Sequence, residues 1–207
     1  MKPAGVFVPS PERALPCEFF QRETLKVARE LLGTVLIKWE SGIYCAARLV
    51  EVEAYLPEGD PANHAFRGKT KRNAPMFEAG GILYVYALYG RHRCANIVTE
   101  EAGRGAAVLL RAAEPLAGME IFRRRRGDVA DHALCRGPAN LASAFGFDLS
   151  DNFRSVCTAD LFVQAPSEPV PEELIAVSPR IGVGQGKELL LRLFVRTSAC
   201  LSGSPRR

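Results

Sequence analysis

The sequence predicts an α+β fold, in which helices surround a mixed, mainly antiparallel curved sheet. Segments with alternating apolar residues recur along the 207 residues and do not alternate regularly with helical patterns, as they would in a parallel βαβ fold. No internal repeat is visible either. With 47% hydrophobic and 24% charged residues, the chain has the composition of a globular protein that buries a real core.

The elements of the first half follow from local patterns. Apolar residues three and four apart predict a helix over residues 24–32, which ends before Gly33. Two alternating segments flank the turn formers Ser41 and Gly42 and predict a hairpin. Glycines on both sides delimit the next strand. The strands predicted in this half are 35–39, 43–55, 82–89, 93–98 and 106–111.

The second half continues the mixture of helices and strands. Helices are predicted over 116–124 and 139–145, and the second has Pro138 near its start and Gly146 past its end, the usual asymmetry of helix termini. Strands are predicted over 161–164, 173–177, 180–183 and 189–196. No linker divides the chain, so we expect one domain over 1–207, with loose tails at 1–14 and 200–207.

Charge and cysteine content narrow the class of protein. A formal net charge of +4 at pH 7 permits a polyanionic partner without requiring one. No apolar run reaches bilayer length and the first residues do not resemble a signal peptide, so we expect a soluble, intracellular protein that does not enter a membrane. The six cysteines are scattered, and we expect reduced thiols packed as small hydrophobic residues.

The positive charges form clusters. Each cluster alone is typical of a solvated loop or helix end, but with three together contact with nucleic acid is an equally open interpretation. They are Arg67 with Lys69, Lys71 and Arg72, then Arg91 and Arg93 on both sides of His92, and the run Arg123 to Arg126.

The stretch LVEVEAYLPEGDPANHAF, residues 49–66, combines acids, a phenol and an imidazole. Strand alternation places one set of side chains on one face and a second set on the other. The first set is Leu49, Glu51, Glu53 and Tyr55, and the second is Val50, Val52 and Ala54. His64 follows in the turn after this strand. A solvated strand face would explain the glutamates without any function, so the pattern alone leaves both interpretations open.

The segment ILYVYALYG is rich in tyrosine. Tyr84 and Tyr86 share a face of the predicted strand, and aromatic residues of this kind often pack a core. Tyr89 fits that interpretation least, because it precedes Gly90 and a basic turn. An aromatic tip beside arginines is suited to stack on bases or wedge between them. An enzyme that acts on a base in duplex DNA needs such a wedge, an aromatic pocket and an activated water.

Together, these segments resemble a known family, the 3-methyladenine DNA glycosylases of the alkyladenine or methylpurine type. The matching pieces, in that family's order, are LPCEFF, VARELLG, VEVEAY, NHAFRGKTKRNAPMF, GILYVYALYG, CANIV, AAVLLRAAEPL, CRGPANL and RIGVG. They extend over nearly the whole chain. The resemblance implies a fold like the carboxy-terminal domain of formyltransferases. It also implies a monofunctional glycosylase of base excision repair that hydrolyses the bond between a damaged purine and its sugar and leaves an abasic site.

The resemblance also implies roles for individual residues. Glu53 matches the general base that activates water, and Arg111 with the Leu109 backbone matches the groups that hold this water. Tyr55, His64 and Tyr86 match the aromatic pocket. Asn96 matches the residue that resists the 2-amino group of guanine, and Tyr89 matches the aromatic inserted into the minor groove. The DNA-binding residues that we expect besides Tyr89 are Arg67, Lys69, Lys71, Arg72, Arg91 and Arg93.

Further expectations concern the chemistry of the site. A general base must be ionised, so we expect Arg111 to hold the pKa of Glu53 down and Glu51 to turn to a partner of its own. No lysine falls in the pocket motifs, so no Schiff-base step is implied. Four residues could be imagined as metal ligands, namely Glu51, Glu53, Asp60 and His64, but the resemblance assigns other roles to two of them. We expect no metal and no cofactor.

The expected partner is double-stranded DNA containing damaged purines, bound by a monomer in the bacterial cytoplasm at the nucleoid or in a eukaryotic nucleus. Two departures from the family pattern are Arg91, where an apolar residue is common, and the final segment LLLRLFVR. Two alternatives remain. One is a non-catalytic nucleic-acid-binding module, which would have no need of Glu53. The other is a metal-dependent hydrolase, which a chelator would inactivate.

Overall fold

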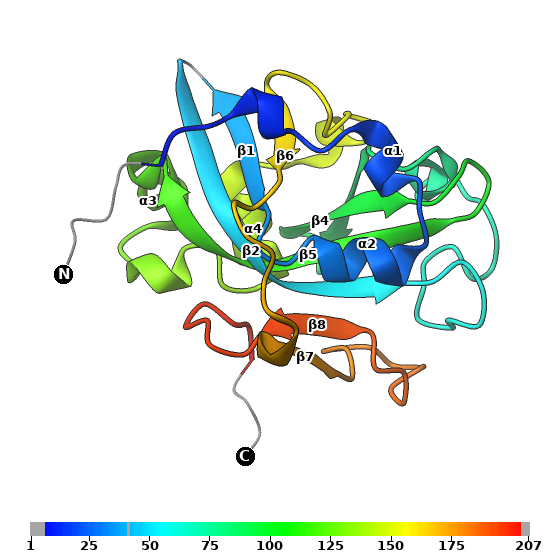
Figure 1. Cartoon of the computed structure of the whole chain (residues 1–207). Coiled ribbons are helices and arrows are strands. Elements are labelled where there is room, and N and C mark those ends of the chain that lie inside the picture. Colours follow the sequence, from blue (N-terminus) through cyan, green and yellow to red (C-terminus); the bar gives the residue numbers. More distant parts are fainter. Residues whose placement is uncertain (1–6, 41, 204–207) are drawn as a thin grey trace.

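The computed structural model describes residues 7–40 and 42–203, and eight strands form one sheet at its centre (Figure 1). The strands are β1 (Val35–Glu40), β2 (Ile43–Tyr55), β3 (Leu83–Leu88), β4 (His92–Thr99), β5 (Ala106–Ala117), β6 (Leu161–Gln164), β7 (Ile175–Ser178) and β8 (Arg192–Val195). Their main order is β3-β4-β5-β2-β1-β6. The pairings between these strands are antiparallel, which confirms the predicted α+β class.

The long strand β2 organises the sheet. It pairs with β5 along one edge, whereas the other edge pairs first with β1 and then, at Glu51 to Glu53, with β8. Figure 1 shows the β7–β8 hairpin below the main sheet, next to the end of β2. Two strands, β5 and β8, therefore flank the part of β2 that carries the two glutamates.

Helices and single helical turns cover the sheet. The α-helices are α1 (Cys17–Phe20), α2 (Thr24–Glu30), α3 (Met119–Arg126) and α4 (Pro138–Phe145), and the 3₁₀ turns are η1 (Pro11–Arg13), η2 (Ala74–Phe77), η3 (Asp131–Ala133), η4 (Leu149–Asp151) and η5 (Glu172–Leu174). Apolar side chains of all four α-helices, such as Phe20, Val27, Phe122 and Phe145, join those of the strands in the largest core cluster. Across the described ranges, no helix combines the length and the apolar character needed to cross a bilayer.

A double irregularity interrupts the pairing of β2 with β5 beside the glutamates. The register shifts on both sides of Glu51, so that Val50 and Arg111 lie between the paired positions. Leu49 consequently packs in the main core with Val52 and Ala54, whereas Val50 packs against Ala112 and Cys200. The expectation that Leu49 shares a face with Glu51 is wrong, because the bulge at Val50 breaks the alternation.

Two predicted elements differ from the structure. Strand β5 continues to Ala117, and Gly118 with a φ of 77° separates it from α3, so the predicted helix over 116–124 begins too early. Residues 180–183 form an irregular loop instead of a strand. The loop follows from its hydrogen bonds, since the Ile181 N–H donates to a carboxylate of β2 and Gly182 has a φ of 79°.

The described parts of both predicted tails are anchored. The Tyr44 hydroxyl donates to the Phe7 carbonyl, and Ala14 forms a β-bridge with Gln164. At the other end, Cys200 and Ser202 are buried. The predicted tails thus make specific contacts over 7–14 and 200–203, while residues 1–6 and 204–207 lie outside the described residues.

The cysteines are also not all reduced. Cys17 of α1 and Cys157 are joined by a disulfide, which corrects the expectation of free thiols at these two positions. The other four, Cys45, Cys94, Cys135 and Cys200, are free and buried, as expected for small hydrophobic residues. The disulfide connects α1 to the segment before β6, on the side of Gly81 where the chain enters β3.

The turn before β3 allows a direct test of the fold. A β-carbon on Gly80 would overlap the Phe20 carbonyl group, whereas Gly184, which also lacks a positive φ, has open space around it. Gly80→Ala should therefore lower the free energy of unfolding by about 1–3 kcal/mol through overpacking. Gly184→Ala should change it little. Urea unfolding of both variants measures the difference, and equal stabilities would contradict the close contact at Gly80.

Candidate active site

The candidate site lies on one face of the sheet, where four paired positions form a row across four strands. Tyr84 of β3 pairs with Asn96 of β4, Asn96 pairs with Leu109 of β5, and Leu109 pairs with Glu53 of β2. Directly paired residues on neighbouring strands point to the same face. The pairing thus gathers residues that are up to 56 positions apart in the chain, and it brings together most of the residues that the sequence singles out.

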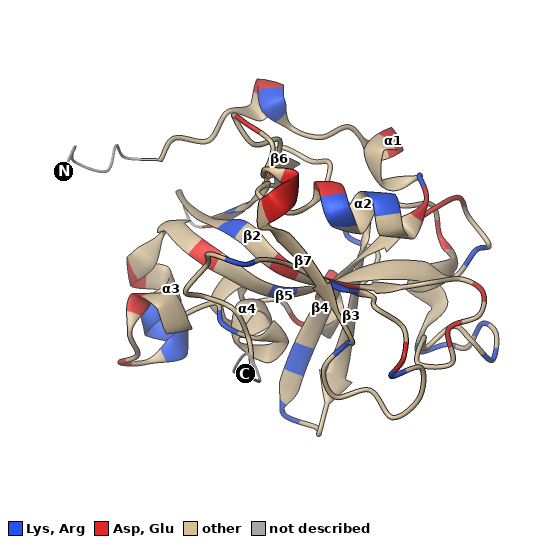
Figure 2. Cartoon of the chain, turned by 60° about the horizontal axis from the view of Figure 1, so that its bottom comes forward, with Lys and Arg blue, Asp and Glu red and all other residues tan. Residues whose placement is uncertain are grey.

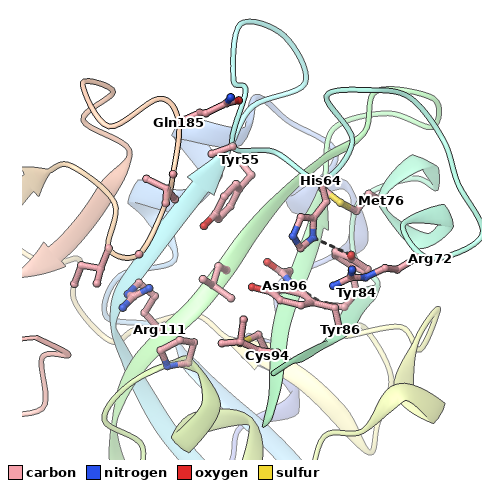
Figure 3. Close-up of a pocket in the computed structure, with 18 of the residues that line it drawn as sticks. Tyr55, His64, Arg72, Met76, Tyr84, Tyr86, Cys94, Asn96, Arg111 and Gln185 are labelled. Carbon is pink, nitrogen blue, oxygen red and sulfur yellow. Dashed lines mark hydrogen bonds between the residues drawn. The ribbon is translucent and has the colours of Figure 1, made fainter. Parts of the chain in front are cut away.

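A cavity of about 530 Å³ opens above this row (Figure 3). Its walls carry aromatic rings on two sides, with Tyr55 facing the region of His64 and Tyr86. The predicted residues that line it are Tyr55, His64, Arg72, Tyr86, Tyr89, Asn96, Leu109 and Arg111. The loop 181–185 closes one side. A cavity of this volume suits a small planar ligand such as a single base.

Glu53 lies behind this cavity and is completely buried. Oε1 accepts a hydrogen bond from the Ile181 N–H at 2.7 Å and lies 3.2 Å from Nη1 of Arg111, while Oε2 accepts from the Tyr55 hydroxyl at 3.1 Å. An ionised carboxylate has about four acceptor positions. Three donors therefore leave room for one more, such as a water.

Arg111 lies between two buried carboxylates. Its Nε is 3.2 Å from Oε1 of Glu51, and its Nη1 is 3.2 Å from Oε1 of Glu53. The bulge in β5 makes this possible, because Arg111 falls between paired positions instead of directly opposite one glutamate. Glu51 also accepts from Arg192 at 2.7 Å, so it has a further partner, but it still shares Arg111.

The ionisation of Glu53 is set by burial more than by Arg111. Burial raises the pKa of Glu53, and although Arg111, the Ile181 amide and the Tyr55 hydroxyl act in the opposite direction, they do not outweigh it. Arg111 lowers the pKa of Glu53 more than Glu51 raises it, as expected, but burial outweighs both, so the expected net lowering of this pKa is wrong. A carboxylate held this way is a stronger base once it is ionised, but a larger fraction of it is protonated at a given pH.

His64 is an exposed residue whose ring contacts two tyrosines of β3. Its Nδ1 lies 3.0 Å from the Tyr84 hydroxyl, and its ring packs edge-on against Tyr86 with centroids 4.7 Å apart. Desolvation of the ring and the positive charge of Arg72 lower the pKa of His64. Burial raises the pKa of Tyr84 to about 12, so both members of this pair are uncharged at neutral pH.

A buried ion pair fixes the two loops beside the cavity. Both terminal nitrogens of Arg180 bond the carboxylate oxygens of Asp60 at 2.6 Å, and one also donates to the Ala54 carbonyl. The guanidinium carbon of Arg180 lies 4.5 Å from the centre of the Tyr55 ring. Arg180 thus supports Tyr55 and presents the Ile181 amide to Glu53. Asp60 is engaged by this arginine, and both glutamates face Arg111.

Tyr89 forms an exposed tip at the edge of the cavity. Its side chain is 89% exposed, and its φ of 49° is an unusual conformation for a bulky residue. Figure 2 shows positive residues along the β3–β4 hairpin and on α3. Among the predicted DNA-binding residues, Arg93 pairs with Asp148 and Lys69 with Glu78. Within the described ranges, none of the other four forms an ion pair.

Several residues of the site received no role in the sequence analysis. Tyr84, Met76, Cys94, Pro138 and the loop 181–185 line the cavity, and Asp60 with Arg180 supports it. The motif RIGVG marks the loop, and the alternation of the tyrosine strand marks Tyr84. Nothing local in the sequence indicates that Arg180 pairs with a residue 120 positions earlier.

The Asp60–Arg180 pair generates a stability prediction. Asp60→Asn or Arg180→Met leaves a buried charge without its partner and should cost about 3–5 kcal/mol of unfolding free energy. The double variant should lose less than the sum of the two single losses. Arg104→Met removes the ion pairs of an exposed arginine with Glu58 and Glu100 and serves as the control with a much smaller loss. Urea unfolding measures all four variants, and additive losses would contradict direct coupling.

Comparisons with known proteins agree with this geometry. The methylpurine-DNA glycosylase family matches residues 18–199. A protein of Chlorobaculum parvum with the provisional name 3-methyladenine DNA glycosylase is 44% identical over 200 residues, covering 94% of this chain and 95% of the relative. A protein of Chlorobium phaeovibrioides with the same provisional name is 46% identical over 191 residues, covering 91% and 96%. The chain belongs to the methylpurine-DNA glycosylase family.

Proposed function

We propose that the protein is a monofunctional DNA glycosylase that excises alkylated or deaminated purines from double-stranded DNA. The observation that carries this proposal is a buried glutamate, Glu53, held by Arg111 and Tyr55 next to an aromatic cavity of about 530 Å³. A base rotated out of the duplex would enter the cavity. Hydrolysis of its bond to the sugar would then leave an abasic site.

The aromatic walls support binding of a flipped base. Tyr55 on one side and His64 with Tyr86 on the other would stack on its two faces, and such stacking contributes about 1–3 kcal/mol per base. This contribution favours a damaged base, because its pairing in the duplex is already weakened. The Asn96 side chain is fixed by a hydrogen bond of 2.9 Å from its Nδ2 to the Tyr84 carbonyl. It would therefore act as a rigid obstacle to the 2-amino group of guanine.

Glu53 would act as the general base. In the proposed step, Glu53 takes a proton from a water held near Arg111 and the Leu109 backbone, and the water oxygen bonds to C1′ of the sugar. The bond from C1′ to the purine nitrogen breaks, and its electron pair leaves with the base. A cationic base such as 3-methyladenine leaves as a neutral molecule. Within the described residues, no lysine lines the cavity, which supports direct hydrolysis without a Schiff base.

The exposed tip would fill the gap in the duplex. Tyr89 is suited to wedge between bases, and the exposed cations Arg67, Lys71, Arg72 and Arg91 are suited to phosphates. The left-handed backbone at Tyr89 supports a functional role. A bulky residue in this conformation costs about 1–3 kcal/mol, and the exposed Tyr89 ring makes no core contact that would offset this cost.

The central test replaces the proposed base. Duplex DNA with hypoxanthine, and alkylated DNA, should lose free base with the wild-type protein, whereas Glu53→Gln should be about 10²–10⁴-fold slower. Because burial raises the pKa of Glu53, the single-turnover rate of the wild type should rise with pH as this carboxyl ionises. Glu53→Gln should show a flat profile, and Glu101→Gln, an exposed glutamate between β4 and β5, should behave like the wild type. Equal release by wild type and Glu53→Gln would refute the role of Glu53.

The proposed wedge has a matched control. Tyr89 and Phe153 are both exposed aromatic residues with positive φ values of 49° and 66°. Tyr89→Ser should reduce single-turnover excision about tenfold or more, because the flipped state loses a stacking contribution of this size. Phe153→Ser should leave excision unchanged. Fluorescence of 2-aminopurine beside the lesion reports flipping directly, and unchanged flipping by Tyr89→Ser would exclude the wedge.

A further inference from the structure

Glu51 is a buried acid that the proposed reaction does not use. It is completely buried, only one residue separates it from Glu53 in β2, and it shares Arg111 with Glu53. A carboxylate in this place competes for the same guanidinium. The hydrogen bonds that Glu51 receives from other donors therefore influence how strongly Arg111 can interact with Glu53.

Ser202, which follows Glu51 by 151 residues, donates two hydrogen bonds to the Glu51 carboxylate. Its backbone N–H donates to Oε2 of Glu51 at 2.5 Å, and its hydroxyl donates to Oε1 at 2.7 Å. The same hydroxyl oxygen accepts from Nε and Nη2 of Arg111 at 3.2 Å and 3.0 Å. Ser202 thus touches both the competing acid and two of the three nitrogens of Arg111.

These contacts leave one nitrogen of Arg111 for the catalytic side. Nε and Nη2 face Ser202 and Glu51, whereas Nη1 lies 3.2 Å from Oε1 of Glu53. We infer that Ser202 is a positioning residue for the proposed reaction. Its hydrogen bonds to Glu51 and Arg111 orient the guanidinium so that Nη1 remains within ion-pair distance of Glu53. This inference rests on the proposed function, and it assigns the segment after β8 a role in the active site.

A purely structural role of Ser202 would be different. The segment after β8 is also held by the Ser198 hydroxyl, which donates to Glu114 at 2.7 Å, and by Arg136, which donates to the Leu201 carbonyl at 2.7 Å. Ser198 contacts neither Arg111 nor the two buried glutamates among the hydrogen bonds of the described residues. It anchors the same segment and therefore serves as a matched control.

The remaining charges around the glutamates stay constant in this comparison. The other titratable or charged groups around them are Arg192 of β8, Tyr55 of β2, Cys94 of β4, and Arg180 with Asp60 from the two loops. None of them contacts the Ser202 hydroxyl. A change caused by Ser202→Ala is therefore transmitted through Glu51 and Arg111.

The experiment compares Ser202→Ala, Ser202→Thr and Ser198→Ala by single-turnover excision of hypoxanthine as a function of pH. Without the hydroxyl, Arg111 moves toward Glu51 and stabilises ionised Glu53 less. The acid limb of the profile should then shift upward by roughly one pH unit, which makes the rate on that limb about tenfold slower. Ser202→Thr retains a hydroxyl and should restore the wild-type limb, and Ser198→Ala should not move it.

Two further measurements separate the possible failures. Glu51→Gln removes the competitor, so the acid limb should shift downward, and Ser202→Ala should have no further effect in that background. The ¹³C signal of the Glu53 carboxyl, assigned with Glu53→Gln, should titrate in parallel without any need for activity. If the wild type releases no base, the proposed function fails and the carbon titration still tests Ser202. Unchanged Glu53 titration in Ser202→Ala would overturn the inference, whatever Glu51→Gln does and even if Ser202→Ala were less stable.

Discussion

The rest of the site depends on the contact of one arginine with two buried carboxylates. Isolated charges in the interior are costly, and removing one partner of a buried pair leaves the other uncompensated. Arg111 is shared by Glu51 and Glu53, and because Glu51 also pairs with Arg192, Glu53 depends on Arg111 more than Glu51 does. The bulge in β5, the pairing of β8 with β2 and the fold of the segment after β8 all bring a donor to these two acids.

Most of the fold could be predicted because strand and helix patterns are local. The strand over 161–164 has the predicted bounds, and β2 and α4 agree with their predictions to within one residue. The bulge at Val50 could not be predicted, since alternation in the sequence looks unbroken there. The helix predicted over 116–124 failed for a related reason: a strand that continues past Pro115 and ends at a glycine has an apolar pattern much like that of a helix start.

The candidate site was predictable only in part. Ordered motifs indicated the rings of the pocket, Glu53 and Arg111, and the structure brings the rings and Arg111 to one cavity, with Glu53 in contact with two of its lining residues. The partners that fix them could not be found in this way, because Arg180 lies 120 residues from Asp60 and Ser202 lies 151 residues from Glu51. The pKa of Glu53 was misjudged for the same reason, since complete burial is a property of the assembled sheet.

The long separation between Glu51 and its partners has a consequence for biosynthesis. Arg192 and Ser202 follow Glu51 by 141 and 151 residues, and a ribosome delivers them long after the strands that carry the tyrosines. Strands β2 to β5 can pair before that time, but their two acids then share a single cation. The charge arrangement around Glu53 is therefore completed only when the segment after β8 docks, which follows the synthesis of strands β2 to β5.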